Sequence, residues 1–540
     1  MYNDDYEELT ENQHQLLEQY VTHTRGHVFV LKNLPEVIKG ALFSRYSRSP
    51  LGLRTLLLKE FVNNSDESQF SSIAGEKSPF DQAAGIQKAQ NFYDRILDGY
   101  GDDSIGELGG AHTAIENISM LGAKVLEDSR IGGSPLEKST RYIYFDQKMK
   151  GEYLFYREPI LMTSAYRDLY VQTCNRLFET YSALIPPLTE IIEKKHPRDP
   201  NVPQGAYNTS LRAKVLDCLR GLLPAGTLTN MGVYGNGRFF EQLLHKLHIH
   251  PLSEMQDIGK RMHEELGKVI PSFIRRSQPT HHTHQSYAKF MEAMQSEIKL
   301  AAALQTDGKR NVSQETVKLL NYDPEGPIKV AAGLLFAQTS YGLDQLTQMC
   351  KGLSEEELGR ILEAGAYGRE SRRHRSPRAL EMASFTFEIV ADFGVYRDLH
   401  RHRMLTQERQ QLGCDLGYWI PPEILGTGLE ISYRHAMDAG KAAHDKIALE
   451  LPEEAQYVVP MAYNVRWYFH LNLRAIQWLT ELRSSQAGHP SYRYVAQAMA
   501  AEVVRVFPEF KRFLGFVDYS GHTLGRLGQE IRKEEKLAAR

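Results

Sequence analysis

The sequence has few cysteines, no long apolar run and no marked excess of either sign of charge. Four of its 540 residues are cysteine, at positions Cys174, Cys218, Cys350 and Cys414, and none of them forms a Cys-x-x-Cys pair. So few scattered thiols exclude a disulfide framework and argue against a metal or redox motif. We expect four reduced, mostly buried cysteines in a cytoplasmic protein.

The longest apolar stretches are too short for a membrane helix, which needs roughly 18 residues. One of the longest is Val330 to Ala337. The start of the sequence, Met-Tyr-Asn-Asp-Asp, is acidic and does not predict a secretion signal. Hydrophobic residues make up 42% and charged residues 24%, which is ordinary for a chain with a large buried core. This composition excludes a disordered, collagen-like or membrane-spanning chain.

Opposite charges almost cancel over the whole sequence. There are 64 lysines and arginines against 67 aspartates and glutamates, so the formal net charge is −3. A chain-wide field that attracts nucleic acid is therefore excluded, while a local pocket for an anion is compatible with this balance. We expect neither a nucleic acid nor a membrane as a partner.

Landmarks recur in the same order in two parts of the sequence, at Gly40–Ser47 and Gly333–Ser340, at Glu107 and Glu381, and at Pro224 and Pro460. An Asn-x-Arg motif begins 12 residues after each of the two prolines, at Asn236 and at Asn472. Ordered matches with one identical spacing indicate a duplicated domain.

The repeats divide the chain into five segments. We predict an N-terminal extension (1–34), a first domain (35–275), a linker with a helix (276–324), a second domain (325–520) and a polar C-terminal tail (521–540). The linker opens with the histidine-rich stretch 281–284, which could bind a metal but which we interpret as polar linker.

Local patterns predict both helices and strands. Helices are predicted over 161–195, 287–305, 353–366 and 472–483, a strand over 385–390, a short helix from 393 to 399 and a loop over 196–204. Ser354 and Glu357 have the spacing of a capping box at the start of one helix. The mixture indicates an α+β fold.

Two short motifs carry candidate chemistry. Arg401-His402-Arg403 follows a predicted helix, and clustered guanidinium groups suit a phosphate or a polarised carbonyl. The segment Ser134–Tyr142 combines hydroxyls, backbone N–H groups and an arginine, as a phosphate cradle does. Each motif is weak alone, because Arg-His-Arg recurs at 373–375 and a serine-rich segment is usually only a turn.

Together the two motifs resemble the signature of the flavin-dependent thymidylate synthases (ThyX). That family carries Arg-His-Arg and then Glu-x-Ser-x-Arg-Tyr in one stretch, followed downstream by Ala-Arg, Asn-x-Arg and a later arginine. The chain resembles two such domains fused in tandem. The resemblance implies an α+β fold in which each domain is a mostly antiparallel sheet with packed helices, arranged as a pseudo-dimer.

The two repeats have lost opposite parts of this signature. The first repeat keeps Glu137, Ser139, Arg141, Tyr142 and Arg220, but has Ser-Arg-Ile at 129–131 and Leu247 where the family has Arg-His-Arg and the later arginine. The second keeps Arg401, His402, Arg403 and Arg483, but has Gln-Leu-Gly at 411–413 and Gln456. Because family sites form between two subunits, the resemblance implies one complete site made from both repeats and a reciprocal site that is dead.

The resemblance also implies residue roles. The substrate-binding positions carried over are Glu137, Ser139, Thr140, Arg141, Arg220, Asp398, Arg401 and Arg483. Of these, Arg401 and Arg483 would be catalytic, with Arg483 favouring the ionised ring nitrogen that makes C5 of uracil nucleophilic. The FAD-binding positions would be Ser104, Glu137, Asn236, Arg238, Glu381, Arg401, His402, Arg403, Asn472 and Arg474. No metal is expected.

The implied reaction is the reductive methylation of dUMP to dTMP with methylenetetrahydrofolate, FAD and NADPH. One departure bears on the substrate, since Asp398 stands where the family has glutamine. Two alternatives therefore stay open. One is FAD- and folate-dependent methylation or hydroxymethylation at C5 of another pyrimidine nucleotide, and the other is a non-catalytic nucleotide- or RNA-binding descendant. Because the family is usually tetrameric, we expect a homodimer of tandem chains, a pseudo-tetramer.

Overall fold

The structure is a computed structural model that describes residues 9–25, 28–46, 49–62, 106–129, 131–306 and 316–539. Its chain divides into two compact units. Unit 1 takes its described residues from 1–116, 125–137 and 230–309, and unit 2 from 117–124, 138–229 and 310–540. Unit 2 thus contains parts of both repeats. Helices and antiparallel strands are mixed, so the predicted α+β class is confirmed.

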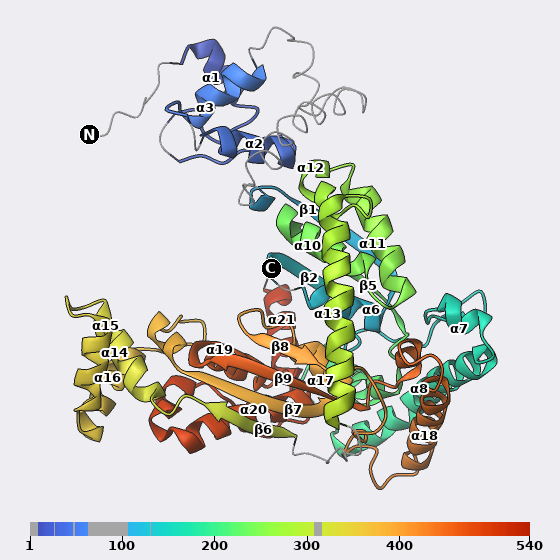
Figure 1. The fold of residues 1–540 in the computed structure, drawn as a ribbon. Helices are drawn as coiled ribbons and strands as arrows, with labels where there is room; N and C mark the ends of the chain where they lie inside the picture. The colour runs from blue at the N-terminus through green and yellow to red at the C-terminus, as the bar shows by residue number, and fades with distance from the viewer. Residues whose placement is uncertain are drawn as a thin grey trace. The chain divides into compact units, whose positions relative to one another are not determined.

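Unit 1 holds most of a three-stranded sheet in the order β1–β5–β2 (Figure 1). Its strands are β1 (Gly110–Ser119), β5 (Leu228–Asn236) and β2 (Gly133–Glu137), and β2 pairs antiparallel with β5. After β1 comes α6 (Met120–Glu127). The other helical segments are α1 (Glu11–Leu17), α2 (Glu36–Tyr46), α3 (Leu53–Leu56), η1 (Leu57–Val62), α10 (Gly237–His248), α11 (Ser253–Leu266), α12 (Pro271–Ile274), η5 (Arg275–Ser277) and α13 (His282–Thr306).

The sequence predicts a polar linker at the histidine-rich stretch 281–284, and the structure differs. His282 begins α13, and His284 is buried. The His284 ring stacks on His245, with the two Nδ1 atoms 2.9 Å apart, and lies edge-on to His248. Burial, followed by the repulsion of neighbouring rings, lowers the pKa of both His245 and His248 to about 4. These rings are therefore neutral in the folded protein at neutral pH.

This cluster predicts acid sensitivity. The unfolded chain binds protons on these histidines near pH 6.5 and the folded chain only near pH 4, so stability falls as the pH drops through that window. We expect a loss of roughly 1–2 kcal/mol for each of His245 and His248 between pH 7 and pH 5, measured by urea denaturation. His284→Phe should reduce the loss, whereas His282→Gln, at an exposed position of the same helix, should not. An equal loss in wild type and His284→Phe would contradict this account.

Unit 2 is built on a four-stranded sheet in the order β6–β7–β9–β8 (Figure 1). The strands are β6 (Val317–Tyr322), β7 (Ser384–Asp392), β9 (Asn464–Asn472) and β8 (Thr406–Arg409), and all neighbours are antiparallel. The buried side chains of Phe385, Phe387, Trp467 and Phe469 form the apolar side of the two central strands. Because β6 precedes residue 325, the sheet includes part of the predicted linker.

Three of the helical segments around this sheet were predicted from the sequence. They are α14 (Gly326–Phe336), α15 (Leu343–Lys351), α16 (Glu355–Ala366), η6 (Arg378–Met382), α17 (Phe393–Leu399), α19 (Leu473–Arg483), α20 (Pro490–Val506) and η8 (Pro508–Leu514). The predicted capping box of Ser354 and Glu357 is present on α16. The predicted strand and the helices at 393–399 and 472–483 are confirmed as β7, α17 and α19.

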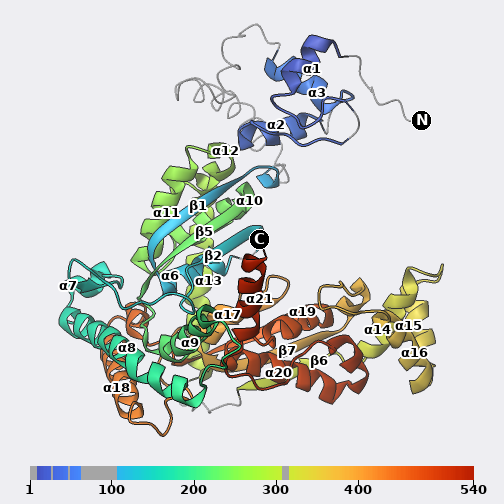
Figure 2. The same cartoon turned by 180° about the vertical axis from the view of Figure 1, so that it is seen from behind.

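The rest of unit 2 is a helical layer. It contains the hairpin β3–β4 (Lys148–Met149, Glu152–Tyr153), α7 (Pro159–Thr163), α8 (Arg167–Lys195), α9 (Gln204–Leu219), η4 (Arg220–Leu222), α18 (Glu430–Ile447), η7 (Glu454–Val458) and α21 (Leu527–Ala538). α8 packs against α9 and α18, and α21 packs on α9 (Figure 2). The segment predicted as a polar tail thus contains a packed helix. Nowhere in the described ranges is a helix both long and apolar enough to cross a membrane.

Inside unit 2 the two repeats meet through a symmetric backbone contact around Pro224 and Pro460, which form an isolated bridge. The amide of Ala225 donates to the carbonyl of Val459 (2.8 Å), and the amide of Met461 donates to that of Leu223 (2.9 Å). The two bonds are equivalent, because each residue of one bond matches a residue of the other bond in the opposite repeat. A second pair of bonds is related in the same way. The amide of Gly226 donates to the carbonyl of Tyr457, and the amide of Ala462 donates to the carbonyl of Gly221. Such a self-complementary contact is what a two-fold interface requires, as expected of a pseudo-dimer.

Candidate functional site

The arginines assigned to the two halves of one site lie in unit 2, and local structure positions each of them. Arg141 lies in a turn shortly after β2, and Arg220 caps the C-terminus of α9. Arg401 follows α17, and Arg483 is the last residue of α19. Cations at helix C-termini are favoured by the helix dipole, which helps to explain three of the four positions.

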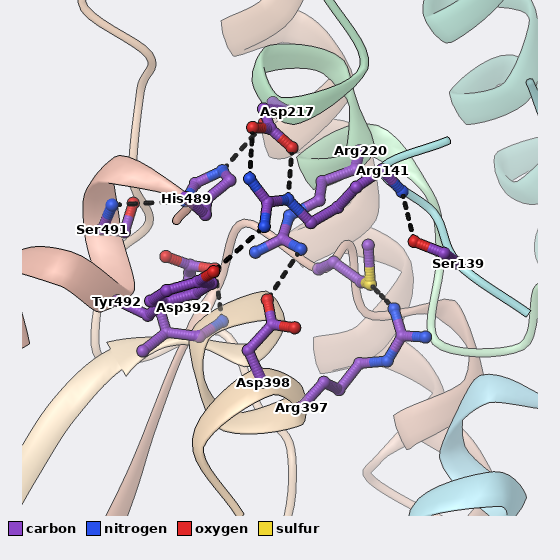
Figure 3. A network of polar contacts seen from close by, with 12 residues as sticks. Ser139, Arg141, Asp217, Arg220, Asp392, Arg397, Asp398, His489, Ser491 and Tyr492 are labelled. Atoms are coloured by element: carbon purple, nitrogen blue, oxygen red, sulfur yellow. Dashed lines mark hydrogen bonds and ion pairs between the residues drawn. The ribbon is translucent and has the colours of Figure 1, made fainter. Parts of the chain in front are cut away.

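Arg141 is held by a buried ion pair (Figure 3). Its Nε and Nη2 donate to the two carboxylate oxygens of Asp217 at 2.6 and 2.7 Å, and its Nη1 donates to Tyr492 Oη at 3.1 Å. The Tyr492 ring centroid lies 5.5 Å from the Arg141 guanidinium carbon and 5.7 Å from that of Arg483. Tyr492, from α20, therefore connects an arginine of the first repeat with one of the second.

Arg220 forms the second ion pair, with Nη1 3.0 Å from Oδ2 of Asp398 (Figure 3). Its Nη2 is buried and has no hydrogen-bond partner among the residues that the structure describes. Burial alone would raise the pKa of Asp398, but nearby cations outweigh it and hold that pKa well below its usual range. These cations are Arg220, Arg141, Arg401 and Arg483. The positive charges of both repeats thus converge on one carboxylate.

Two further buried groups surround these pairs. Asp392 caps α17 by accepting from the amide of Val395 at 3.0 Å, and burial raises its pKa to about 6. His489 caps α20, and burial followed by the charge of Arg220 lowers its pKa to about 3. The His489 Nε2 lies 3.0 Å from the carbonyl of Asp217, and its Nδ1 accepts from the amide of Ser491. His489 is therefore neutral and donates from Nε2.

The Arg-His-Arg triplet divides its side chains between the interior and the solvent. His402 is buried, and its Nε2 accepts from Nε of Arg483 at 3.0 Å. Burial, followed by the charge of Arg483, lowers the pKa of His402 well below its usual range, so the ring is a neutral acceptor. The side chains of Arg401 and Arg403 are exposed, and Nε of Arg401 donates to the carbonyl of Arg397.

The Asn-x-Arg motifs make the same contacts in both repeats. Asn472 caps α19, and Arg474 pairs with Glu381 at 2.7 Å in unit 2. In unit 1, Asn236 caps α10, and Arg238 pairs with Glu107 at 2.8 Å. Repeated geometry supports the duplication inferred from the sequence. The FAD-binding roles of these residues stay predictions.

For the other predicted residues, the structure shows burial or a local hydrogen bond. Ser139 Oγ accepts from the amide of Arg141, and Thr140 is buried. Glu137 is buried at the end of β2 in unit 1. Ser104 lies outside the described residues.

The reciprocal positions of the second repeat carry no guanidinium group, since Gln456 stands in place of Arg220 and Gly413 in place of Arg141. Gln456, which matches Arg220, accepts from the amide of Leu412 at 3.1 Å. Gln411, which matches Ser139, donates to Glu453 at 2.8 Å. These contacts are internal, so this half presents no positive charge of its own motif to a ligand.

Sequence reasoning missed Asp217, Tyr492 and His489. Asp217 lies three residues before Arg220 on α9, and this spacing on one helix face could have indicated a shared role. No local signal identifies Tyr492 or His489, because their partners lie 351 and 272 residues away in the sequence.

The Arg141–Asp217 pair predicts a large stability effect. Asp217→Ala leaves a buried guanidinium group without its carboxylate, which costs about 3–5 kcal/mol in the free energy of unfolding. Thermal and urea denaturation measure this loss. Glu190→Ala is the control, because its pair with Lys194 is exposed and such pairs contribute little. A loss below about 1 kcal/mol in Asp217→Ala would contradict the pairing.

Comparison with known proteins supports the resemblance. The family described as thymidylate synthase complementing protein matches residues 60–272 and 318–509. The chain is 54% identical over 528 residues to a UPF0159 protein of Chlamydia pneumoniae, covering 98% of each. It is 34% identical over 526 residues to a UPF0159 protein of Thermoplasma acidophilum, covering 92% of this chain and 99% of that one.

Two further similarities cover a little over a third of this chain. A flavin-dependent thymidylate synthase of Clostridium tetani is 31% identical over 227 residues, covering 37% of this chain and 86% of that protein. A solved UMP/dUMP methylase of Streptomyces cacaoi, bound with 5-Br dUMP, aligns with 17% identity and a TM-score of 0.31 over 38% of this chain and 97% of that one. From the two matched regions, which span most of the sequence, the chain belongs to the thymidylate synthase complementing protein (ThyX) family and carries two regions of that family in tandem.

Proposed function

We propose that this chain is a flavin-dependent thymidylate synthase with one composite site. It would convert dUMP to dTMP with methylenetetrahydrofolate, FAD and NADPH. Family membership supports a methyltransferase-like enzyme that uses FAD. The observation that carries the finer proposal is that arginines of both repeats meet in unit 2. Arg141 and Arg483 lie 5.5 and 5.7 Å from the centroid of one ring, that of Tyr492. Arg220 pairs with Asp398, on which the charges of Arg401 and Arg483 also act.

Charge balance suits a nucleotide monophosphate. Four guanidinium groups face two carboxylates, Asp217 and Asp398, whose pKa values are both lowered well below the usual range. Positive charge is in excess even when the buried Asp392, whose pKa is about 6, is counted as a third carboxylate, and a phosphate monoester carries about two negative charges near pH 7. The buried Nη2 of Arg220 has no partner in the described part of the chain and would donate to a phosphate oxygen.

The arrangement around Arg483 suits electrostatic catalysis at the base. His402 holds Nε of Arg483, so the terminal N–H groups of that guanidinium are directed by a fixed contact. A positive charge held beside a uracil ring stabilises the ionised ring nitrogen and so raises the electron density at C5. A preorganised charge of this kind needs no reorientation during the reaction.

The cysteines fit a reaction without an enzyme nucleophile. All four are buried, and burial raises the pKa of each thiol. A protonated buried thiol is inert as a nucleophile. This agrees with activation of the base by charge alone.

The donor set at the end of α17 fits FAD. Arg401 and Arg403 are both exposed there, and guanidinium groups in solvent are suited to the diphosphate of a dinucleotide. Glu381 and Arg474 form a further polar pair in unit 2. FAD, when bound, supplies the hydride that reduces the transferred one-carbon group. We also propose that two chains associate as a homodimer and that the predicted domain bounds describe the two repeats.

Activity measurements test the composite site. The purified protein should be yellow and should release tritium from C5-labelled dUMP with methylenetetrahydrofolate and NADPH. Arg141→Gly gives the first repeat the residue found in the second, and Arg401→Ala removes a charge from the other side, so each should lower kcat/KM by about 100-fold or more. Gln411→Ala, at the exposed position of the second repeat that matches Ser139, should leave activity unchanged.

Three outcomes separate the hypotheses. Full activity in either arginine variant would overturn the shared site. A yellow protein that does not release tritium from dUMP would favour another pyrimidine. A colourless protein would favour the non-catalytic nucleotide- or RNA-binding descendant.

Asp398 favours one second candidate, an enzyme that acts at C5 of a cytosine nucleotide. Its carboxylate stands where the family has glutamine, and a carboxylate accepts well from the 4-amino group of cytosine. In this structure the same carboxylate also neutralises Arg220. The substrate therefore depends on which role Asp398 serves.

Asp398→Gln distinguishes the two substrates. If the substrate is dUMP, the change frees Arg220 from its negative partner, so KM for dUMP should fall by several-fold while kcat is retained. If the substrate is a cytosine nucleotide, the wild-type protein should release tritium from C5-labelled dCMP and the variant should lose that activity. Steady-state tritium release with both nucleotides measures this, and a variant with unchanged constants would assign Asp398 no role in substrate binding.

A further inference from the structure

The segment after η8, residues 518–526, is fixed against the body of unit 2, and we call it the strap. Arg493 Nη2 donates to the carbonyl of Ser520 at 2.8 Å, and Ser484 Oγ accepts from the amide of Asp518. Gly525 lies so close to the carbonyl of Gln486 that a side chain there would clash. Because α21 then packs on α9, the strap is anchored at both ends (Figure 2).

Arg526 is the buried residue of the strap. It is only 6% exposed, and its guanidinium carbon lies 4.1 Å from the ring centroid of Tyr142. Its Nη1 is buried and lacks a hydrogen-bond partner among the described residues. A buried charged donor without a partner is costly, so an arginine held in this way indicates a missing acceptor.

A small cavity that is partly open to solvent adjoins Arg526, and the space it encloses is about 20 Å³. Its lining is largely polar and includes Arg141, Ser210, Lys214, Asp217, His522 and Arg526. The other two cations already have acidic partners, since Arg141 pairs with Asp217 and Lys214 with Glu423. Ser210 is 2% exposed, and its Oγ likewise has no partner within the described ranges. The cavity thus offers Nη1 of Arg526 and the hydroxyl of Ser210, neither of which has a hydrogen-bond partner in the described part of the chain.

We propose that this cavity binds a phosphate-type oxyanion, with Arg526 and Ser210 as its donors. A guanidinium group fixed over an aromatic ring presents its N–H groups to an oxyanion with little loss of entropy. The matched family regions end at residue 509, so Arg526 lies outside them. The anion is either free phosphate or the phosphate of the nucleotide substrate, and the second source rests on the proposed function.

Binding measurements on the full chain test the site without requiring turnover. Calorimetry is done with inorganic phosphate, dUMP and deoxyuridine. Arg526→Met keeps an apolar stem over Tyr142 but removes the charge, and it should weaken phosphate binding by about 10- to 100-fold. Ser210→Ala should weaken it by a smaller factor. Arg532→Met, at an exposed position of α21, is the matched control and should bind phosphate as the wild type does.

The ligands then separate the two sources. If the substrate phosphate occupies the cavity, Arg526→Met weakens dUMP and phosphate alike, leaves deoxyuridine unchanged, and phosphate competes with dUMP. If free phosphate occupies the cavity, the variant loses phosphate binding but retains dUMP binding. The wild type then binds phosphate and dUMP at the same time. The proposal is overturned if the wild type does not bind phosphate at millimolar concentration. It is also overturned if a folded Arg526→Met, checked by circular dichroism, binds phosphate as well as the wild type.

Discussion

Buried carboxylates make it possible for several arginines to share a small volume. Like charges this close repel one another strongly in a low-dielectric interior, and each buried charge needs a partner. The carboxylate of Asp217 accepts hydrogen bonds from Nε and Nη2 of Arg141. Asp398 pairs with Arg220, and the charges of Arg401 and Arg483 also act on Asp398. Because cations from both repeats act on Asp398, this carboxylate links the charged groups of the two repeats.

The symmetric backbone contact at Pro224 and Pro460 relates equivalent residues of the two repeats. It places Arg220 and its counterpart Gln456 at equivalent positions in the two repeats. On one side an arginine pairs with Asp398, and on the other a glutamine binds the backbone of Leu412. A duplicated interface offers two equivalent sites, so one can lose its charged groups while the other keeps them. A neutral amide side chain such as that of Gln456 can then form a hydrogen bond with the backbone of its own repeat instead of with a ligand.

Much of the fold was predictable because its signals are local. The alternation at 385–390, the capping box of Ser354 and the apolar spacing at 393–399 each act within a few residues, and each gave the element observed. The histidine stretch at 281–284 failed for the opposite reason. It looks like polar linker, yet His284 is buried against His245 and His248, and that burial is decided by how α13 packs on its neighbours.

The sequence by itself determined the duplication, the family and the sorting of motif arginines between the repeats, because these are properties of residue order and spacing. Only the tertiary structure decided which charges neutralise one another. The partners of Arg141 and Arg220 lie 76 and 178 residues away, and His402 meets Arg483 across 81 residues. Coulomb energy and hydrogen bonding depend on distance in space, which is set by the packing of helices and sheet, so no local pattern could have identified these pairs.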